Sequence, residues 1–169
     1  DLAAQTYRDV WWYYHNLEWT ELGQNYHLHP LQKSHIYPIK EPFACLIYTA
    51  SDHIEQIETL IQSLPDIQFK IAARVMVSDK LAKMTVYPNV TVYNGIHYLL
   101  DVDAELVATC QVLLDINHGE KTGEILNQFA KLGKPILAFE NTKSYEVGQE
   151  VYAIDQVQEM IEKLREISK

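Results

Sequence analysis

From residue 42 onward, short apolar runs alternate with amphipathic segments, and this alternation restricts the fold more than any other feature of the sequence. The apolar runs expected to be strands are residues 43–48, 69–77, 90–93, 112–116, 135–139 and 151–153. The segments between them place apolar residues three or four positions apart, as amphipathic helices do. Strands and helices that alternate in this way form βαβ units around a parallel sheet. The sequence therefore predicts an α/β fold, a three-layer Rossmann-like sandwich with a mostly parallel sheet of about six strands.

The expected helices are bounded by residues suited to their ends. Ser51 and Asp52 are predicted to cap the first helix, Ser78 the second and Asp155 the last, because their side chains accept hydrogen bonds from free backbone N–H groups. Gly133 is expected to end the helix before the fifth strand, since glycine readily adopts the left-handed conformation found there. In such a sheet, ligands bind outside the carboxyl ends of the strands. The loops that follow the strands are therefore where a site is expected.

The first 40 residues follow a different pattern. Within residues 7–22, which hold all three tryptophans, apolar and aromatic side chains recur at helical spacing, whereas residues 23–40 are polar and aperiodic. We therefore divide the chain into residues 1–40, an aromatic-rich helical tail with a connector, and residues 41–169, the Rossmann-like domain. An aromatic-rich helix without a core of its own must pack either on the domain that follows it or on a domain upstream. Because the chain begins with Asp1 rather than methionine, we expect the helix to belong to a domain upstream.

Charge and composition argue against several classes of partner. The net charge of −9 is unfavourable for binding nucleic acid, which needs clustered lysine and arginine. No apolar run approaches the roughly 18 residues of a membrane span, and no secretory signal opens the chain. Cys45 and Cys110 lie inside apolar stretches and are expected to be buried free thiols. These features together predict a cytoplasmic protein.

Residues 113–135 carry the first resemblance to a known family. They run from a strand through a polar, glycine-containing loop and a helix to Gly133-Lys134-Pro135 and the next strand. This order resembles the nucleotide-binding half of GT-B-fold glycosyltransferases, in which the helix N-terminus faces the diphosphate of the sugar donor. The resemblance covers about residues 42–169. It places Glu120 on the donor-sugar side and Gln128 where the family has a glutamate for the ribose.

The resemblance and the position of the loops give one set of candidate ligand-binding residues. For a UDP-sugar these are Thr49, Ser51, Asn117, His118, Glu120 and Gln128. Each also has a purely structural interpretation: His118 can pack locally, and Glu120 is a favourable charge at a helix start. The family usually has an arginine and a lysine near the first strand, but residues 48–55 contain neither, so a diphosphate would lack its strongest contacts. We therefore predict no catalytic residue in this segment.

Two groups of residues are candidate metal ligands by their type and spacing. Asp101 and Asp103 form an Asp-x-Asp pair, which GT-A enzymes use to hold a divalent ion on UDP. Too little sequence follows the pair for a GT-A core, so we interpret it as acidic residues in a first helical turn. His27, His29 and His35 lie in the connector without a cysteine or carboxylate in a recognisable arrangement. The expectation is no metal site and no cofactor in this segment.

A second resemblance comes from the tail. Residues 11–19, with three tryptophans and two tyrosines, are similar to the end of family-8-type retaining glycosyltransferases. Some streptococcal enzymes of that kind, which glycosylate serine-rich adhesins, carry an additional C-terminal domain. Residues 114–119 are similar to the helper glycosyltransferases of those systems. The resemblance implies a bacterial hexosyltransferase whose upstream domain holds the active site and a divalent metal. The present segment would be accessory, retaining residual nucleotide-sugar binding and docking an acceptor glycoprotein or a partner glycosyltransferase.

Two alternative functions stay open on the sequence alone. The domain could be the active UDP-sugar-binding half of a GT-B glycosyltransferase, although an acceptor half would then have to precede it. It could also be a flavodoxin-like or receiver-like binding module, for which Asp52 and Lys134 offer a loose match. Dinucleotide and ATP binding are disfavoured, because neither Gly-x-Gly-x-x-Gly after the first strand nor a Walker A loop is present.

Overall fold

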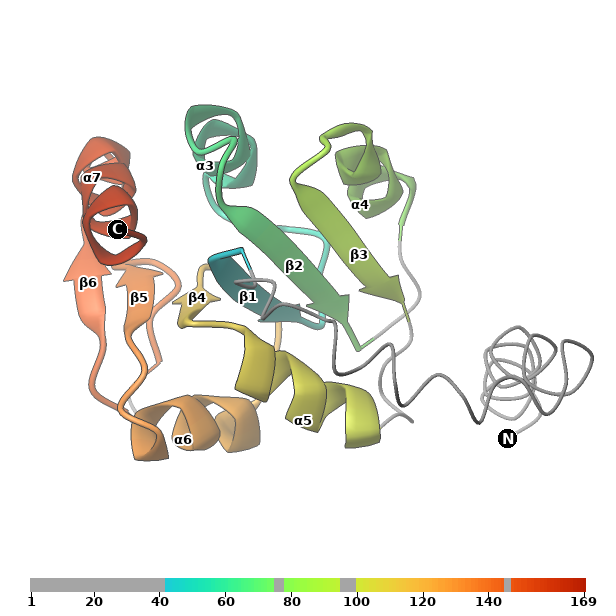
Figure 1. Cartoon of the computed structure of the whole chain (residues 1–169), viewed down its shortest axis with the longest axis vertical. Helices are drawn as coiled ribbons and strands as arrows, with labels where there is room; N and C mark the ends of the chain where they lie inside the picture. The colour runs from blue at the N-terminus through green and yellow to red at the C-terminus, as the bar shows by residue number, and fades with distance from the viewer. Residues whose placement is uncertain (1–41, 75–77, 95–99, 145–146) are drawn as a thin grey trace, which may run out of the picture. The chain divides into compact units, whose positions relative to one another are not determined.

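The computed structural model describes residues 42–74, 78–94, 100–144 and 147–169. In this part of the chain, parallel strands form one sheet in the order β3-β2-β1-β4-β5-β6 (Figure 1). The strands are β1 (Ala44–Thr49), β2 (Gln68–Ala73), β3 (Val90–Asn94), β4 (Val112–Asp115), β5 (Ile136–Phe139) and β6 (Glu150–Tyr152). The order reverses between β1 and β4, which is the topological switch point of a doubly wound sheet.

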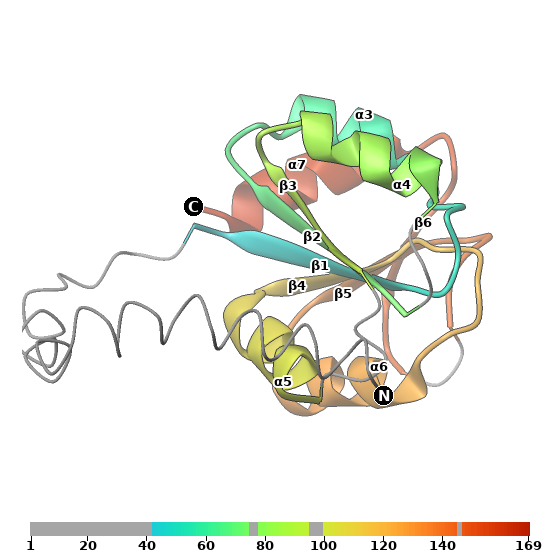
Figure 2. The ribbon, with the colours of Figure 1, turned by 90° about the vertical axis from the view of Figure 1, so that its right-hand side faces the viewer.

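Helices cover both faces of the sheet. They are α3 (Ile57–Ser63), α4 (Asp79–Lys83) with the short 3-10 helix η2 (Met84–Val86), α5 (Leu100–Thr109), α6 (Gly123–Lys131) and α7 (Val157–Ile167). Figure 2 shows α3, α4 and α7 on one face and α5 and α6 on the other. The predicted Rossmann-like sandwich is confirmed. No helix in the described ranges has the length and apolarity needed to cross a bilayer.

The two helical layers pack on alternate residues of the strands. Along β1, Cys45 and Ile47 belong to the core beneath α3, α4 and α7, whereas Leu46 and Tyr48 belong to the core beneath α5 and α6. Because both faces are covered, the strand is apolar throughout rather than alternating. Cys45 and Cys110 are buried and are not joined by a disulfide, as the sequence predicts. Burial raises the pKa of the Cys45 thiol far above its usual range, so this thiol stays neutral.

Two of the predicted helix ends are confirmed. Ser78 is the N-cap of α4, and its Oγ accepts a hydrogen bond from the Leu81 amide at 3.4 Å. Gly133 follows α6 with a φ of 67°, in the left-handed region that suits glycine after a helix.

Two other predicted caps are wrong. The first helix begins only at Ile57, after Gln56, because Ser51 and Asp52 lie in a loop that contacts the loop after β4. The last helix has Gln156 rather than Asp155 at its N-cap position. The Gln156 side chain accepts a hydrogen bond from the Ala153 amide and so closes the turn before the helix.

The predicted tail helix and the division at residue 40 lie outside the described residues. The same holds for residues 75–77, the end of the predicted second strand. The described part of that strand, β2, ends at Ala73 and is followed by Arg74.

Lys134 has a structural role at the amino ends of the strands, whereas the site is expected at their carboxyl ends. Its Nζ donates to the carbonyl oxygens of Val107 (2.5 Å), Ala108 (3.2 Å) and Cys110 (2.8 Å) at the end of α5. Those carbonyls have no partner within the helix, and a cation is favourable there. Lys134 precedes β5 and is committed to α5, so it cannot act at the carboxyl edge as a receiver-like lysine would.

Candidate functional site at the carboxyl edge of the sheet

The loops that follow β1 and β4 are joined to each other across the switch point. Ile54 and Asn117 form an antiparallel bridge. On either side of it the Glu55 amide donates to the Ile116 carbonyl (2.8 Å) and the His118 amide donates to the His53 carbonyl (3.0 Å). We call this paired segment, residues 51–55 with 116–119, the loop junction. Backbone pairing therefore bridges the position where a doubly wound sheet usually opens a crevice.

Gly119 lets the two loops approach each other closely. A Cβ atom at this position would lie 2.8 Å from the Ser51 Cβ, 3.0 Å from the Ser51 amide nitrogen and 3.2 Å from the Ala50 carbonyl carbon. Two of these neighbours are backbone atoms, which cannot rotate away. The glycine thus serves a close backbone approach, one of the situations in which only glycine fits.

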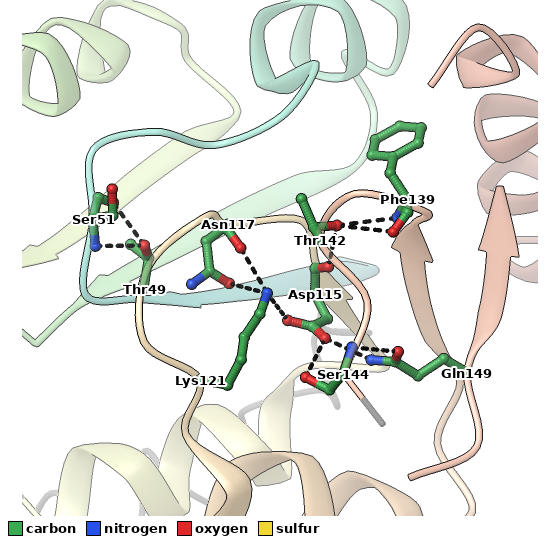
Figure 3. Close-up of polar contacts among 9 residues, drawn as sticks. All are labelled: Thr49, Ser51, Asp115, Asn117, Lys121, Phe139, Thr142, Ser144 and Gln149. Atoms are coloured by element: carbon green, nitrogen blue, oxygen red, sulfur yellow. Dashed lines mark hydrogen bonds and ion pairs between the residues drawn. The ribbon is translucent and has the colours of Figure 1, made fainter. Parts of the chain in front are cut away.

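Asp115, at the carboxyl end of β4, is buried and is the centre of a polar network (Figure 3). Its Oδ1 accepts from the Lys121 ammonium at 2.6 Å, and its Oδ2 accepts from the Ser144 hydroxyl (2.8 Å) and the Gln149 amide (2.6 Å). The Asp115 carbonyl accepts from the Thr142 hydroxyl at 2.8 Å. The carboxylate thereby ties the loops after β4 and β5 together through side chains.

The cations described at this edge already have partners within the chain. Lys121 also donates to the Asn117 carbonyl at 2.6 Å, in addition to its ion pair with Asp115. Arg74 follows β2, and its Nη1 donates to the Thr122 hydroxyl at 3.3 Å, just before α6. The sequence does not point to Arg74 as a site residue. Arg74 is far from the loop after β4 along the chain, and only the fold brings the two together.

The structure brings four of the six candidate ligand residues together. Thr49 and Asn117 are buried at the ends of their strands, and Ser51 and His118 lie in the loop junction. The Thr49 hydroxyl donates to the Ser51 carbonyl at 2.6 Å and accepts from the Ser51 amide at 3.0 Å, so it orders the turn after β1 (Figure 3). These residues form one cluster at the carboxyl edge.

The other two candidates have no described contact with that cluster. Glu120 is exposed in the loop before α6. Gln128 lies in the second turn of α6, where its side-chain amide donates to Glu124 at 3.4 Å on the same helix. Their proposed contacts with a donor sugar and its ribose remain predictions.

Asn117 has an unpartnered donor. Its Oδ1 is 3.5 Å from the Lys121 ammonium, but its Nδ2 is buried and has no hydrogen-bond partner among the described residues. Figure 3 shows this nitrogen turned away from Lys121. A buried donor without a partner is costly, so a polar group of a bound molecule would be favourable here.

Asp103 lies in the first described turns of α5 and contacts Tyr48 on β1. The Tyr48 hydroxyl donates to Asp103 Oδ2 at 3.1 Å, and Oδ1 is buried without a partner among the described residues. Burial raises the pKa of Asp103, and the nearby Glu124 adds to the increase, while the Tyr48 hydrogen bond partly offsets it. Within the described ranges Asp103 belongs to no cluster of potential metal ligands, and the Asp101 side chain is not described.

The parallel sheet, its switch point and the polar cluster there define a Rossmann-like domain of the type found in GT-B glycosyltransferases. Residues 45–169 match the family model described as GftB/GlyA-F C-terminal domain. The chain therefore belongs to the GftB/GlyA-F C-terminal domain family.

Relatives and solved structures agree with this assignment. The chain is 86% identical over its whole length to glycosyltransferase GlyA of Streptococcus pneumoniae and spans 24% of that protein. Over 57% of its length it is 39% identical to the stabilizing protein GtfB of a UDP-N-acetylglucosamine–peptide N-acetylglucosaminyltransferase in Streptococcus gordonii, spanning 21% of that protein. The chain thus covers about a quarter or less of these relatives.

The fold also superposes on solved glycosyltransferase structures. The apo form of GlyE from Streptococcus pneumoniae has a TM-score of 0.68 at 29% identity, over 80% of this chain and 36% of that chain. The GtfA/B complex bound to UDP and GlcNAc has a TM-score of 0.64 at 34% identity, over 73% of this chain and 28% of that chain.

Proposed function

We propose that this chain is an accessory domain of a longer streptococcal-type glycosyltransferase. It docks the acceptor glycoprotein or a partner glycosyltransferase, while catalysis takes place in a domain upstream. The relatives support this proposal in two ways: they extend well beyond the matched region, and one of them is itself named a stabilizing protein.

The loop junction is the single observation that carries the proposal. A catalytic donor site at the switch point needs a crevice into which the nucleotide fits. Here two backbone hydrogen bonds and the close packing of Gly119 on Ser51 join the chain's own loops to each other at the switch point. Opening the crevice would break both hydrogen bonds, at a net cost of about 1 kcal/mol each.

The charges at the edge support the same conclusion. A diphosphate needs fixed cations, but Lys121 is neutralised by Asp115, and Arg74 lies close enough to the Asp103 carboxyl to offset part of the rise that burial causes in its pKa. Glu120, exposed in the same loop, adds a further negative charge. The edge is therefore poorly suited to hold UDP tightly.

Residual nucleotide-sugar binding is the second candidate function. It is favoured by the unpartnered Asn117 Nδ2, which could donate to a phosphate or a hydroxyl, and by Arg74, which could leave Thr122 for an anion. The solved relative bound to UDP and GlcNAc gives this candidate a precedent in a similar fold.

Calorimetric titration with UDP and UDP-GlcNAc separates the two candidates. A domain used only for docking should show no saturable heat up to about 1 mM nucleotide, a dissociation constant that corresponds to a binding free energy of about 4 kcal/mol. Saturable binding that Asn117→Ala and Arg74→Met each weaken, while Lys169→Ala leaves it unchanged, would favour the nucleotide-binding function instead. Lys169 is exposed at the end of the chain, which makes it a suitable control.

A further inference from the structure

Three potential metal ligands meet on the outer side of the loop junction. His53 and Glu55 come from the loop after β1, and His118 comes from the loop after β4. One ligand atom from each lies within 4.8 Å of the others. His118 Nε2 is 2.8 Å from Glu55 Oε2, and the two imidazole rings stack with centroids 4.0 Å apart.

The backbone holds these three residues in place without a ligand. The hydrogen bonds of Glu55 to Ile116 and of His118 to His53 set the register between the two loops. The Asn141 amide donates to Glu55 Oε2 at 2.9 Å, as outer-shell groups do to ligating carboxylates. The cluster is therefore preorganised, with its carboxylate already oriented by a neighbour.

The ligand types select the ion. Two imidazole nitrogens and one carboxylate oxygen suit zinc and similar borderline metals, whereas calcium and magnesium prefer all-oxygen sites. Around a tetrahedral zinc ion with bonds near 2.0–2.1 Å, ligand atoms lie about 3.3 Å apart. The present separations are comparable: His118 Nε2 is 2.8 Å from Glu55 Oε2, and all three ligand atoms lie within 4.8 Å of one another. The chain's net charge of −9 also favours a cation.

We propose that His53, Glu55 and His118 bind a divalent zinc-type ion that fastens the loop after β1 to the loop after β4. Three protein ligands leave a fourth position for water or for a group from a bound partner. The site lies outside the buried Asp115 network and does not depend on the accessory function proposed above. Sequence analysis expected no metal site, because the pairing of His118 with the His53-x-Glu55 segment depends on loop contacts that spacing does not reveal.

Titration of the whole chain with ZnCl₂, followed by calorimetry, tests this site. One equivalent should bind, and Glu55→Gln and His118→Gln should each weaken binding by at least about tenfold. Asn141→Ala should have a similar or smaller effect.

The His27→Ala/His29→Ala/His35→Ala triple variant is the matched control, since it removes three other histidines and should bind zinc like the unmodified chain. Circular dichroism checks that every variant is folded.

Cobalt substitution provides the second readout. A tetrahedral Co²⁺ spectrum that His118→Gln abolishes and the triple connector variant retains supports the site. The inference is overturned if the unmodified chain binds no zinc, if Glu55→Gln and His118→Gln bind zinc as it does, or if binding is lost only in the connector variant. In any of these cases the His118–Glu55 contact is a hydrogen-bonded pair and nothing more.

Discussion

Asp115→Ala is expected to lower the free energy of unfolding by about 3 kcal/mol, because it removes one partner of a largely buried ion pair. The substitution leaves Lys121 without its carboxylate and takes the acceptor from Ser144 and Gln149. The Asp115 side chain is only 4% exposed, but that of Lys121 is 26% exposed, so partial hydration keeps the loss at the lower end of the range for buried pairs. Urea unfolding monitored by circular dichroism measures the change.

A double-mutant cycle isolates the ion pair from the rest of the network. Lys121→Met should also destabilise, and the Asp115→Ala/Lys121→Met variant should lose less than the sum of the single changes. Asp66→Ala, at an exposed aspartate, should stay within about 0.5 kcal/mol of the unmodified chain. If Asp115→Ala unfolds at the same urea concentration as that control, the network contributes nothing to stability and this account of the edge fails.

Gly119→Ala is expected to destabilise the domain by about 2 kcal/mol and to loosen the loop junction. The added Cβ would lie closer to Ser51 than real Cβ atoms approach, and backbone atoms of Ser51 and Ala50 block the simplest relief. The Glu55 and His118 amides, which hold the junction, should therefore exchange their hydrogens faster. Urea unfolding and hydrogen exchange measure the two effects.

Gly148→Ala is the matched control for this change. A Cβ atom at Gly148 would meet nothing within 4 Å, and its φ does not lie in the left-handed region. The variant should therefore remain within about 0.5 kcal/mol of the unmodified chain. Equal stability of Gly119→Ala and Gly148→Ala, with unchanged exchange of the two amides, would show that the loops are not closely packed.

Much of the fold could be predicted because it follows from local patterns. The apolar runs buried on both faces gave the strands, and Ser78 and Gly133 marked helix ends by their own backbone preferences. The cap at Ser51 was wrong for a tertiary reason: residues 51–55 are used in the loop junction, so α3 starts later than its sequence suggests. The cap at Asp155 was wrong for a local reason, because Gln156 closes the turn before α7 and takes the N-cap position.

The candidate site was predictable only in outline. Parallel strands bring their carboxyl ends together, so Thr49 and Asn117 could be placed at one edge from sequence alone. The partners of Asp115 could not, because Ser144 and Gln149 come from the loop after β5, about 30 residues away. Glu55 could not be recognised as a site residue for the same reason. Its contact with His118 depends on how the loops after β1 and β4 pair.

The most direct test of the accessory function uses the related pneumococcal glycosyltransferase GlyA, with and without the segment that corresponds to residues 42–169. Two rates are compared: hydrolysis of a UDP-sugar donor by water, and transfer to an acceptor glycoprotein. An accessory docking domain predicts that donor hydrolysis stays within about twofold, while kcat/KM for transfer falls by at least about tenfold. A parallel loss of both rates in a truncated protein that remains folded would contradict the account, because it would place the segment within the donor site itself.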